Sequence, residues 1–153
     1  MTVYRAAWIC PIDQPPIRDG EVRLQDGRIV AIGPSQFNGA RSTDTDDLLI
    51  DQGNVVMLPG LINAHTHLEL SWLRGRVPPA SHFTEWVKTM FAIRGRPDGA
   101  MSADQIAPIR QAILELQSTG TVAVGDISNS LAAVGPMREA DLGGVVFHEL
   151  LGF

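Results

Sequence analysis

An apolar stretch that ends in two histidines constrains this chain more than any other feature. Residues 55–71 read VVMLPGLINAHTHLELS, an apolar run broken at Pro59-Gly60 and followed by a His-x-His pair. On a strand, residues two apart share a face, so His65 and His67 would project together, about 6.5 Å apart at the backbone. Two imidazoles so placed can bind one ion, at about 2.0–2.1 Å from each nitrogen for zinc. The pair alone does not choose among zinc, iron, nickel and copper.

The composition limits the classes of protein to consider. With 153 residues, 44% hydrophobic and 19% charged, the chain has the size and balance of a globular domain with its own core. The net charge of −5 argues against nucleic acid as a partner. No apolar run reaches the roughly 18–20 residues needed to cross a membrane, and the N-terminus lacks the apolar core of a signal peptide. Cys10, the single cysteine, cannot form an internal disulfide. Together these features predict a cytoplasmic protein.

Residues 1–54 are expected to form a small unit rich in strands. Residues 3–9 and Leu48–Asp51 read as strands, and two alternating segments flank Asp26-Gly27. Asp-Gly supplies the positive φ angles of a two-residue hairpin turn, so this segment predicts a β-hairpin. The polar, acidic residues 35–47 are expected to form a solvated loop.

Residues 55–153 alternate between strand and helix patterns. A helix capped by Ser81 or Thr84 is expected to run through Arg94, and a second helix to cover residues 102–118, with Ser102 and Gln105 as a capping box. Apolar strands at 121–126 and 145–149 enclose a short helix at 131–140. This order is typical of parallel βαβ units, and the apolar strands predict burial on both faces of the sheet.

The string LPGLINAHTHLE, residues 58–69, resembles the signature of the amidohydrolase superfamily, and Asn63-Ala64 resembles its deaminase and chlorohydrolase branch. The resemblance implies an α/β fold: a TIM (β/α)₈ barrel of the metal-dependent hydrolase type with a small β-sandwich. Residues 1–54 would be the sandwich portion and 55–153 the first three βα units. Because such a barrel takes about 250 residues, we expect this chain to be a truncated, N-terminal portion. The later histidines, the aspartate and the catalytic glutamate of the family have no counterpart here, so its catalytic base is unknown.

The resemblance also implies an activity and a cofactor. Family members hydrolyse C–N bonds other than peptide bonds, and the implied reaction is deamination of an aminated heterocycle such as a purine, a pyrimidine or a related nucleoside. The implied cofactor is a divalent metal, zinc in the first place and iron as the alternative, held by His65 and His67.

Two further side chains near the pair are candidates for binding the substrate. Glu69 could hydrogen-bond a substrate nitrogen at the mouth of the site; the alternative is a structural partner of Arg74 or Arg76. Trp72 could line a pocket for a flat ring, or simply pack.

Other classes of function stay open at this point. One is a cyclic amide hydrolase, similar to a dihydroorotase or an imidazolonepropionase. Another is a non-catalytic polypeptide that folds only with a partner segment, and the partner could be a second copy of the chain or the remainder of the barrel. We expect the 153-residue chain alone to turn over no substrate and to be unstable or to self-associate.

Overall fold

The chain divides into two compact units, Met1–Pro59 and Gly60–Phe153. The computed structural model describes residues 1–35, 47–95 and 101–150, so most of the polar loop expected at 35–47 lies outside the described residues. The boundary expected after residue 54 falls earlier than this division, because the short strand β5 (Val56–Met57) pairs with β1 (Thr2–Ile9) in the first unit.

The first unit is a mixed sheet in the strand order β3-β2-β1-β4, with β5 also pairing with β1. Strands β1 and β2 (Ile17–Gln25) run antiparallel, and β4 (Leu48–Asp51) and β5 run parallel to β1. A small core packs on this sheet from buried Ala6, Ile9 and Val22, with Ile17, Leu24 and Met57 against them.

The hairpin expected at Asp26-Gly27 is confirmed. Strands β2 and β3 (Arg28–Pro34) pair antiparallel, with Gln25 opposite Arg28. Asp26 has φ 50° and Gly27 φ 74°, the left-handed conformations that such a turn requires. The turn is therefore fixed by its own two residues.

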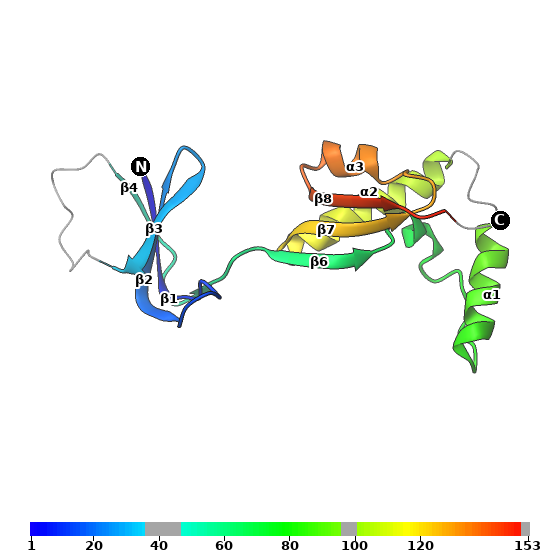
Figure 1. Cartoon of the computed structure of the whole chain (residues 1–153), viewed down its shortest axis with the longest axis horizontal. Helices are drawn as coiled ribbons and strands as arrows, with labels where there is room; N and C mark the ends of the chain where they lie inside the picture. Colours follow the sequence, from blue (N-terminus) through cyan, green and yellow to red (C-terminus); the bar gives the residue numbers. More distant parts are fainter. Residues whose placement is uncertain (36–46, 96–100, 151–153) are drawn as a thin grey trace. The chain divides into compact units, whose positions relative to one another are not determined.

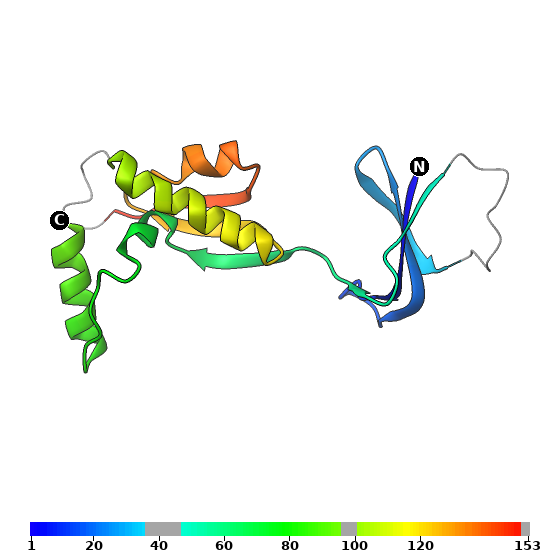
Figure 2. The ribbon, with the colours of Figure 1, turned by 180° about the vertical axis from the view of Figure 1, so that it is seen from behind.

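The second unit is a parallel sheet in the order β6-β7-β8, formed by Leu61–Thr66, Thr121–Ser128 and Gly143–His148. Helices α2 (Ala103–Ser118) and α3 (Val134–Glu139) connect the strands and cover one face of the sheet (Figures 1 and 2). The core on this face gathers buried side chains from the strands, the helices and the turn after β6: Leu68, Ile109, Ala112, Ile113, Val124, Ala133, Met137 and Leu142.

The opposite face of the sheet carries exposed apolar side chains, whereas strands of this composition are buried on both faces in a complete barrel. Ile62 is 73% exposed, Val145 57% and Phe147 55%. The apolar composition of these strands fits a sheet covered on both sides, but the described residues supply helices for one side. Exposed apolar strands support the expectation of self-association, which stays a prediction.

The remaining elements follow β6. A short 3₁₀ helix, η1 (Leu68–Leu73), leads to α1 (Phe83–Arg94), which stands apart from the sheet in Figure 1. Helix α1 begins after His82 without a side-chain cap, so the cap expected from Ser81 or Thr84 is not formed. The capping box of α2 is present: the Ser102 N–H donates to Gln105 Oε1 at 2.9 Å. Among the described residues, no helix is long and apolar enough to span a membrane.

Candidate metal centre

His65 and His67 lie at the carboxyl end of β6, where parallel α/β folds collect their functional residues. Their ring centroids are 5.2 Å apart with an interplanar angle of 69°, and both side chains are exposed. His65 belongs to the strand, whereas His67 has left it and precedes η1, with φ −132° and ψ 71°. The rings therefore lie close together, as the sequence predicted. Their closeness does not come from the alternation of side chains along a regular strand, because His67 lies outside β6.

A bulge in β6 separates the histidines from regular pairing. Asn63 pairs with Val124 and Thr66 with Asp126, so β6 carries one residue more than β7 over this stretch. The His65 N–H donates instead to the side chain of Asn63, at 3.2 Å from Oδ1. Bulges of this kind re-aim side chains next to functional sites.

Gly125 gives the bulge the space that it needs. A Cβ at this residue would lie 2.5 Å from the carbonyl oxygen of Ala64, closer than side chains are found to approach. The backbones of β6 and β7 can therefore come together beside His65 only because position 125 has no side chain.

Asp126 holds the chain on both sides of His67. Its Oδ1 accepts hydrogen bonds from the Thr66 hydroxyl at 3.0 Å and from the Leu68 N–H at 2.7 Å. Asp126 is fully buried, and burial raises the pKa of its carboxyl, while the hydrogen bonds from Leu68 and Thr66 oppose the rise. Among the described residues, its Oδ2 is the buried side-chain atom without a hydrogen-bond partner.

Glu69 is the centre of a second buried network. Its Oε1 accepts from Arg94 Nη2 at 2.7 Å and from the Asn129 N–H at 3.0 Å. Its Oε2 accepts from the Ser128 hydroxyl at 2.7 Å and from the N–H and hydroxyl of Ser130 at 2.8 and 2.6 Å. The network joins η1 to the end of α1 and to the residues after β7.

The ionisation of Glu69 follows from this network. Burial works against the charged form, but the hydrogen bonds from Ser130, Asn129 and Ser128 together outweigh it and lower the pKa of the carboxyl. The carboxylate is 3% exposed and paired with a guanidinium that is 9% exposed. A charge pair so well buried and so fully hydrogen-bonded fixes the positions of the elements that carry it.

The partner of Glu69 is thus Arg94 and neither of the two arginines that the sequence suggested. Arg74 makes a bidentate pair with Glu115 of α2, at 3.0 and 2.8 Å. The Arg76 guanidinium lies 5.5 Å from the ring centroid of Trp72 in a cation–π contact. That Glu69 and Trp72 bind substrate stays a prediction.

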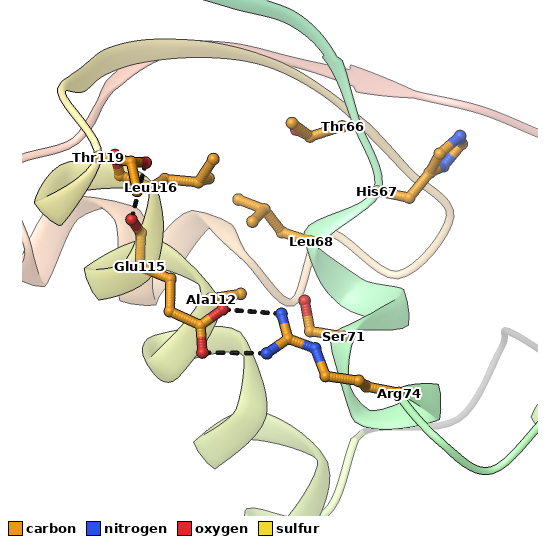
Figure 3. Close-up of a pocket in the computed structure, with 9 residues that line it drawn as sticks. All are labelled: Thr66, His67, Leu68, Ser71, Arg74, Ala112, Glu115, Leu116 and Thr119. Carbon is orange, nitrogen blue, oxygen red and sulfur yellow. Dashed lines mark hydrogen bonds and ion pairs between the residues drawn. The ribbon is translucent and has the colours of Figure 1, made fainter.

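Two hollows lie beside His67. The first, of about 460 Å³, lies between η1 and α2; Figure 3 shows Leu68 pointing into it and the ring of His67 pointing away. The second, of about 360 Å³, has His67 and Ser71 on one side and Trp86 and Met90 of α1 on the other. The second hollow combines an imidazole with an aromatic wall.

The sequence missed several of these residues for a common reason. The positions of Asn63, Gly125 and Asp126 gain meaning only when β6 and β7 lie side by side, and Trp86 had no predicted role beyond the helix expected through Arg94. The strand end at Asp126 was the one available signal. Among the described residues, no group of three or more His, Cys, Asp or Glu side chains could hold a metal. The donors present fit part of a metal site, two imidazoles at one strand end.

Comparison with known proteins agrees with this fold. The chain is 32% identical over 145 residues to a 5-methylthioadenosine/S-adenosylhomocysteine deaminase of Moorella thermoacetica, covering 94% of the chain and 33% of the relative. The chain therefore spans about a third of the length of this curated relative. A comparison with models of known protein families finds no match.

Comparison with solved structures points to the same kind of protein. An aminofutalosine deaminase from Helicobacter pylori in complex with methylthio-coformycin matches with a TM-score of 0.78 and 29% identity, over 99% of this chain and 36% of that one. A variant of atrazine chlorohydrolase from Arthrobacter aurescens TC1, complexed with zinc and atraton, shares the fold with a TM-score of 0.71 and 20% identity, over 95% of this chain and 35% of that one.

The class defined by these observations is the metal-dependent hydrolase of TIM-barrel type, matched over its N-terminal portion; the described strands form an open part of such a barrel. Within that class, the relatives of this chain are deaminases, and its structural neighbours are deaminases and chlorohydrolases of the amidohydrolase superfamily.

Proposed function

We propose that this chain forms the N-terminal part of a metal-dependent aminohydrolase that removes ammonia from an aminated nucleoside or a related heterocycle. The observation that carries the proposal is the pair of exposed imidazoles, 5.2 Å apart, at the carboxyl end of β6. His65 and His67 would supply two ligands of one divalent ion. A catalytic zinc usually takes three protein ligands and a water, so further ligands would come from outside the described residues.

The names of the relatives support the substrate class. The Moorella protein is a deaminase of methylthioadenosine and S-adenosylhomocysteine, and the Helicobacter pylori structure holds methylthio-coformycin. These compounds support a purine nucleoside modified at its 5′ position as the substrate. Zinc is the proposed metal, with iron as the alternative, because the chlorohydrolase with this fold contains zinc.

When bound, the metal would lower the pKa of a water molecule so that hydroxide attacks the carbon that bears the amino group. The residues of this chain would hold the metal ion and orient the substrate. His65 and His67 hold the ion, and the hollow with Trp86 and Met90 accepts the flat ring next to His67. Trp72 and Glu69 remain candidates for substrate binding, Glu69 with both oxygens already accepting hydrogen bonds.

The proposal extends to partners and location. The partners would be a small-molecule substrate and the remainder of a barrel, in the same polypeptide or in a second copy, without nucleic acid or membrane. A cytoplasmic location belongs to the same proposal and rests on the single cysteine.

A chimaera tests the activity. This chain would replace the matching N-terminal third of the Moorella deaminase, and ammonia release from 5-methylthioadenosine and adenosine would be measured with and without Zn²⁺. We expect zinc-dependent release that His65→Ala abolishes. His82→Ala is the matched control, because His82 is exposed and lies before α1. A folded chimaera that binds zinc and releases no ammonia would contradict the deaminase proposal.

A further inference from the structure

Asp126 differs from every other carboxylate that the structure describes. It is fully buried, and its Oδ2 is the buried side-chain atom left without a hydrogen-bond partner in the described part of the chain. Burying a carboxylate in this state is unfavourable, so the stability of the fold alone gives no reason for an aspartate here. Its other oxygen, Oδ1, shows what the side chain does.

Oδ1 is bonded to the two residues that flank His67. The Thr66 hydroxyl lies at 3.0 Å and the Leu68 N–H at 2.7 Å, and Figure 3 shows Thr66 and Leu68 on either side of His67. The Leu68 N–H is at the first position of η1, where helical structure leaves donors unsatisfied. No side chain of its own segment caps η1, so Asp126 supplies the acceptor from the neighbouring strand.

His67 depends on this support because regular structure does not hold it. The pairing of β6 with β7 ends at Thr66, one residue before His67. The φ and ψ angles of His67, −132° and 71°, belong to neither a strand nor a helix. The ring is exposed and points away from the first hollow (Figure 3), so packing around the ring does not fix it either. Its direction is set by the backbone on its two sides.

We propose that Asp126 is the positioning residue of the metal site: its Oδ1 fixes residues 66–68 so that the ring of His67 stays beside that of His65. This inference rests on the proposed function for its metal, and on the described hydrogen bonds for its geometry. Asp126 acts through Thr66 and Leu68 and touches neither metal nor substrate.

Three variants of the full chain separate positioning from general packing. Asp126→Ala removes Oδ1, and Asp126→Asn keeps an oxygen at that place in nearly the same volume. Ser128→Ala is the matched control. It also deletes a fully buried polar group at the end of β7, but the Ser128 hydroxyl bonds to Glu69 and the Leu131 N–H and not to the flanks of His67.

The first readout needs no metal. NMR would report the side-chain rotamer of His67 and the hydrogen exchange of the Leu68 amide. We expect Asp126→Ala to average the His67 rotamer and to speed exchange at Leu68, while Asp126→Asn and Ser128→Ala leave both close to the wild type. An ordered His67 in Asp126→Ala, or equal disorder in Ser128→Ala, would overturn the proposal.

The second readout is the affinity for Zn²⁺, measured by competition with a chelator. Loss of a residue that supports a metal ligand without binding the metal itself costs about 10- to 100-fold in metal affinity. We expect such a loss for Asp126→Ala and little change for Ser128→Ala. Wild-type chain that binds no zinc through His65 and His67 would reject the proposed function and leave the NMR result to judge the positioning role.

If Asp126→Ala does not fold, Thr66→Val provides the test instead. This variant removes the hydroxyl donor to Oδ1 with almost no change in volume, and keeps the Leu68 bond. We expect a smaller change of the same kind in the His67 rotamer and in zinc affinity. No change in either would overturn the proposal.

Discussion

The hairpin at Asp26-Gly27 and the bulge at His65 both take the chain out of a regular strand, but they are restrained in different ways. The hairpin is held by the positive φ angles of its own two residues. The bulge is held by Gly125 and Asp126, about 60 positions away in the sequence. The first feature is local and needs no partner, whereas the second exists only when two strands have come together. The candidate site is built on the second kind.

The largest effect is expected where the distant restraint is a buried charge. Glu69→Ala would leave Arg94 without its partner, and breaking a buried pair costs about 3–5 kcal/mol of unfolding free energy. Glu115→Ala is the matched control, because its pair with Arg74 is exposed to solvent and contributes little. Chemical denaturation of both variants measures the difference. Equal, small losses of stability would show that the buried pair contributes no more than the exposed one.

The same network predicts a dependence on pH. The pKa of Glu69 is lowered from 4.5 in the folded chain, so its stabilising contribution is present above pH 4.5 and is lost as the pH falls through the lowered value. The difference in unfolding free energy between wild type and Glu69→Gln should therefore be large at neutral pH and shrink below pH 4.5. Denaturation curves at several pH values test this, and a difference that grows on acidification would have the wrong sign.

Paired glycine variants compare the two regions directly. In Gly125→Ala the new Cβ would meet the Ala64 carbonyl at 2.5 Å, and overpacking of this kind costs about 1–3 kcal/mol. In Gly27→Ala there is nothing within 4 Å, and the cost is that of a left-handed φ, about 1 kcal/mol. Zinc affinity should fall in Gly125→Ala and stay unchanged in Gly27→Ala. If Gly125→Ala binds zinc as the wild type does, the close approach of the strands is not needed for the site.

The smallest effect is expected at Asn63. Asn63→Ala removes an exposed hydrogen bond from the His65 N–H, worth about 0.5–1.5 kcal/mol. We expect a modest fall in zinc affinity and faster hydrogen exchange at His65, with Leu68 unaffected. Mass spectrometry or NMR exchange at the two amides provides the test, and an unprotected His65 amide in the wild type would remove the basis of the prediction.

The same contrast explains what the sequence could predict. The closeness of the two histidines was predicted from the alternation of a strand, although His67 lies outside the regular strand. The hairpin, the capping box at Ser102 and the order of strands and helices follow from local patterns. The bulge and the roles of Gly125 and Asp126 do not, since they arise from the register between β6 and β7. The pairing of Glu69 with Arg94 was missed because it also joins distant parts of the chain: Arg94 follows 25 residues later, at the end of a separate helix.

X-ray absorption of the zinc-loaded chain tests the central claim most directly. If His65 and His67 hold one ion, the spectrum should contain the scattering of two imidazoles at about 2.0–2.1 Å. His65→Ala should reduce this to one imidazole or abolish binding, and His82→Ala should change nothing. A zinc ion without imidazole scattering, or a spectrum that His65→Ala leaves intact, would contradict the account.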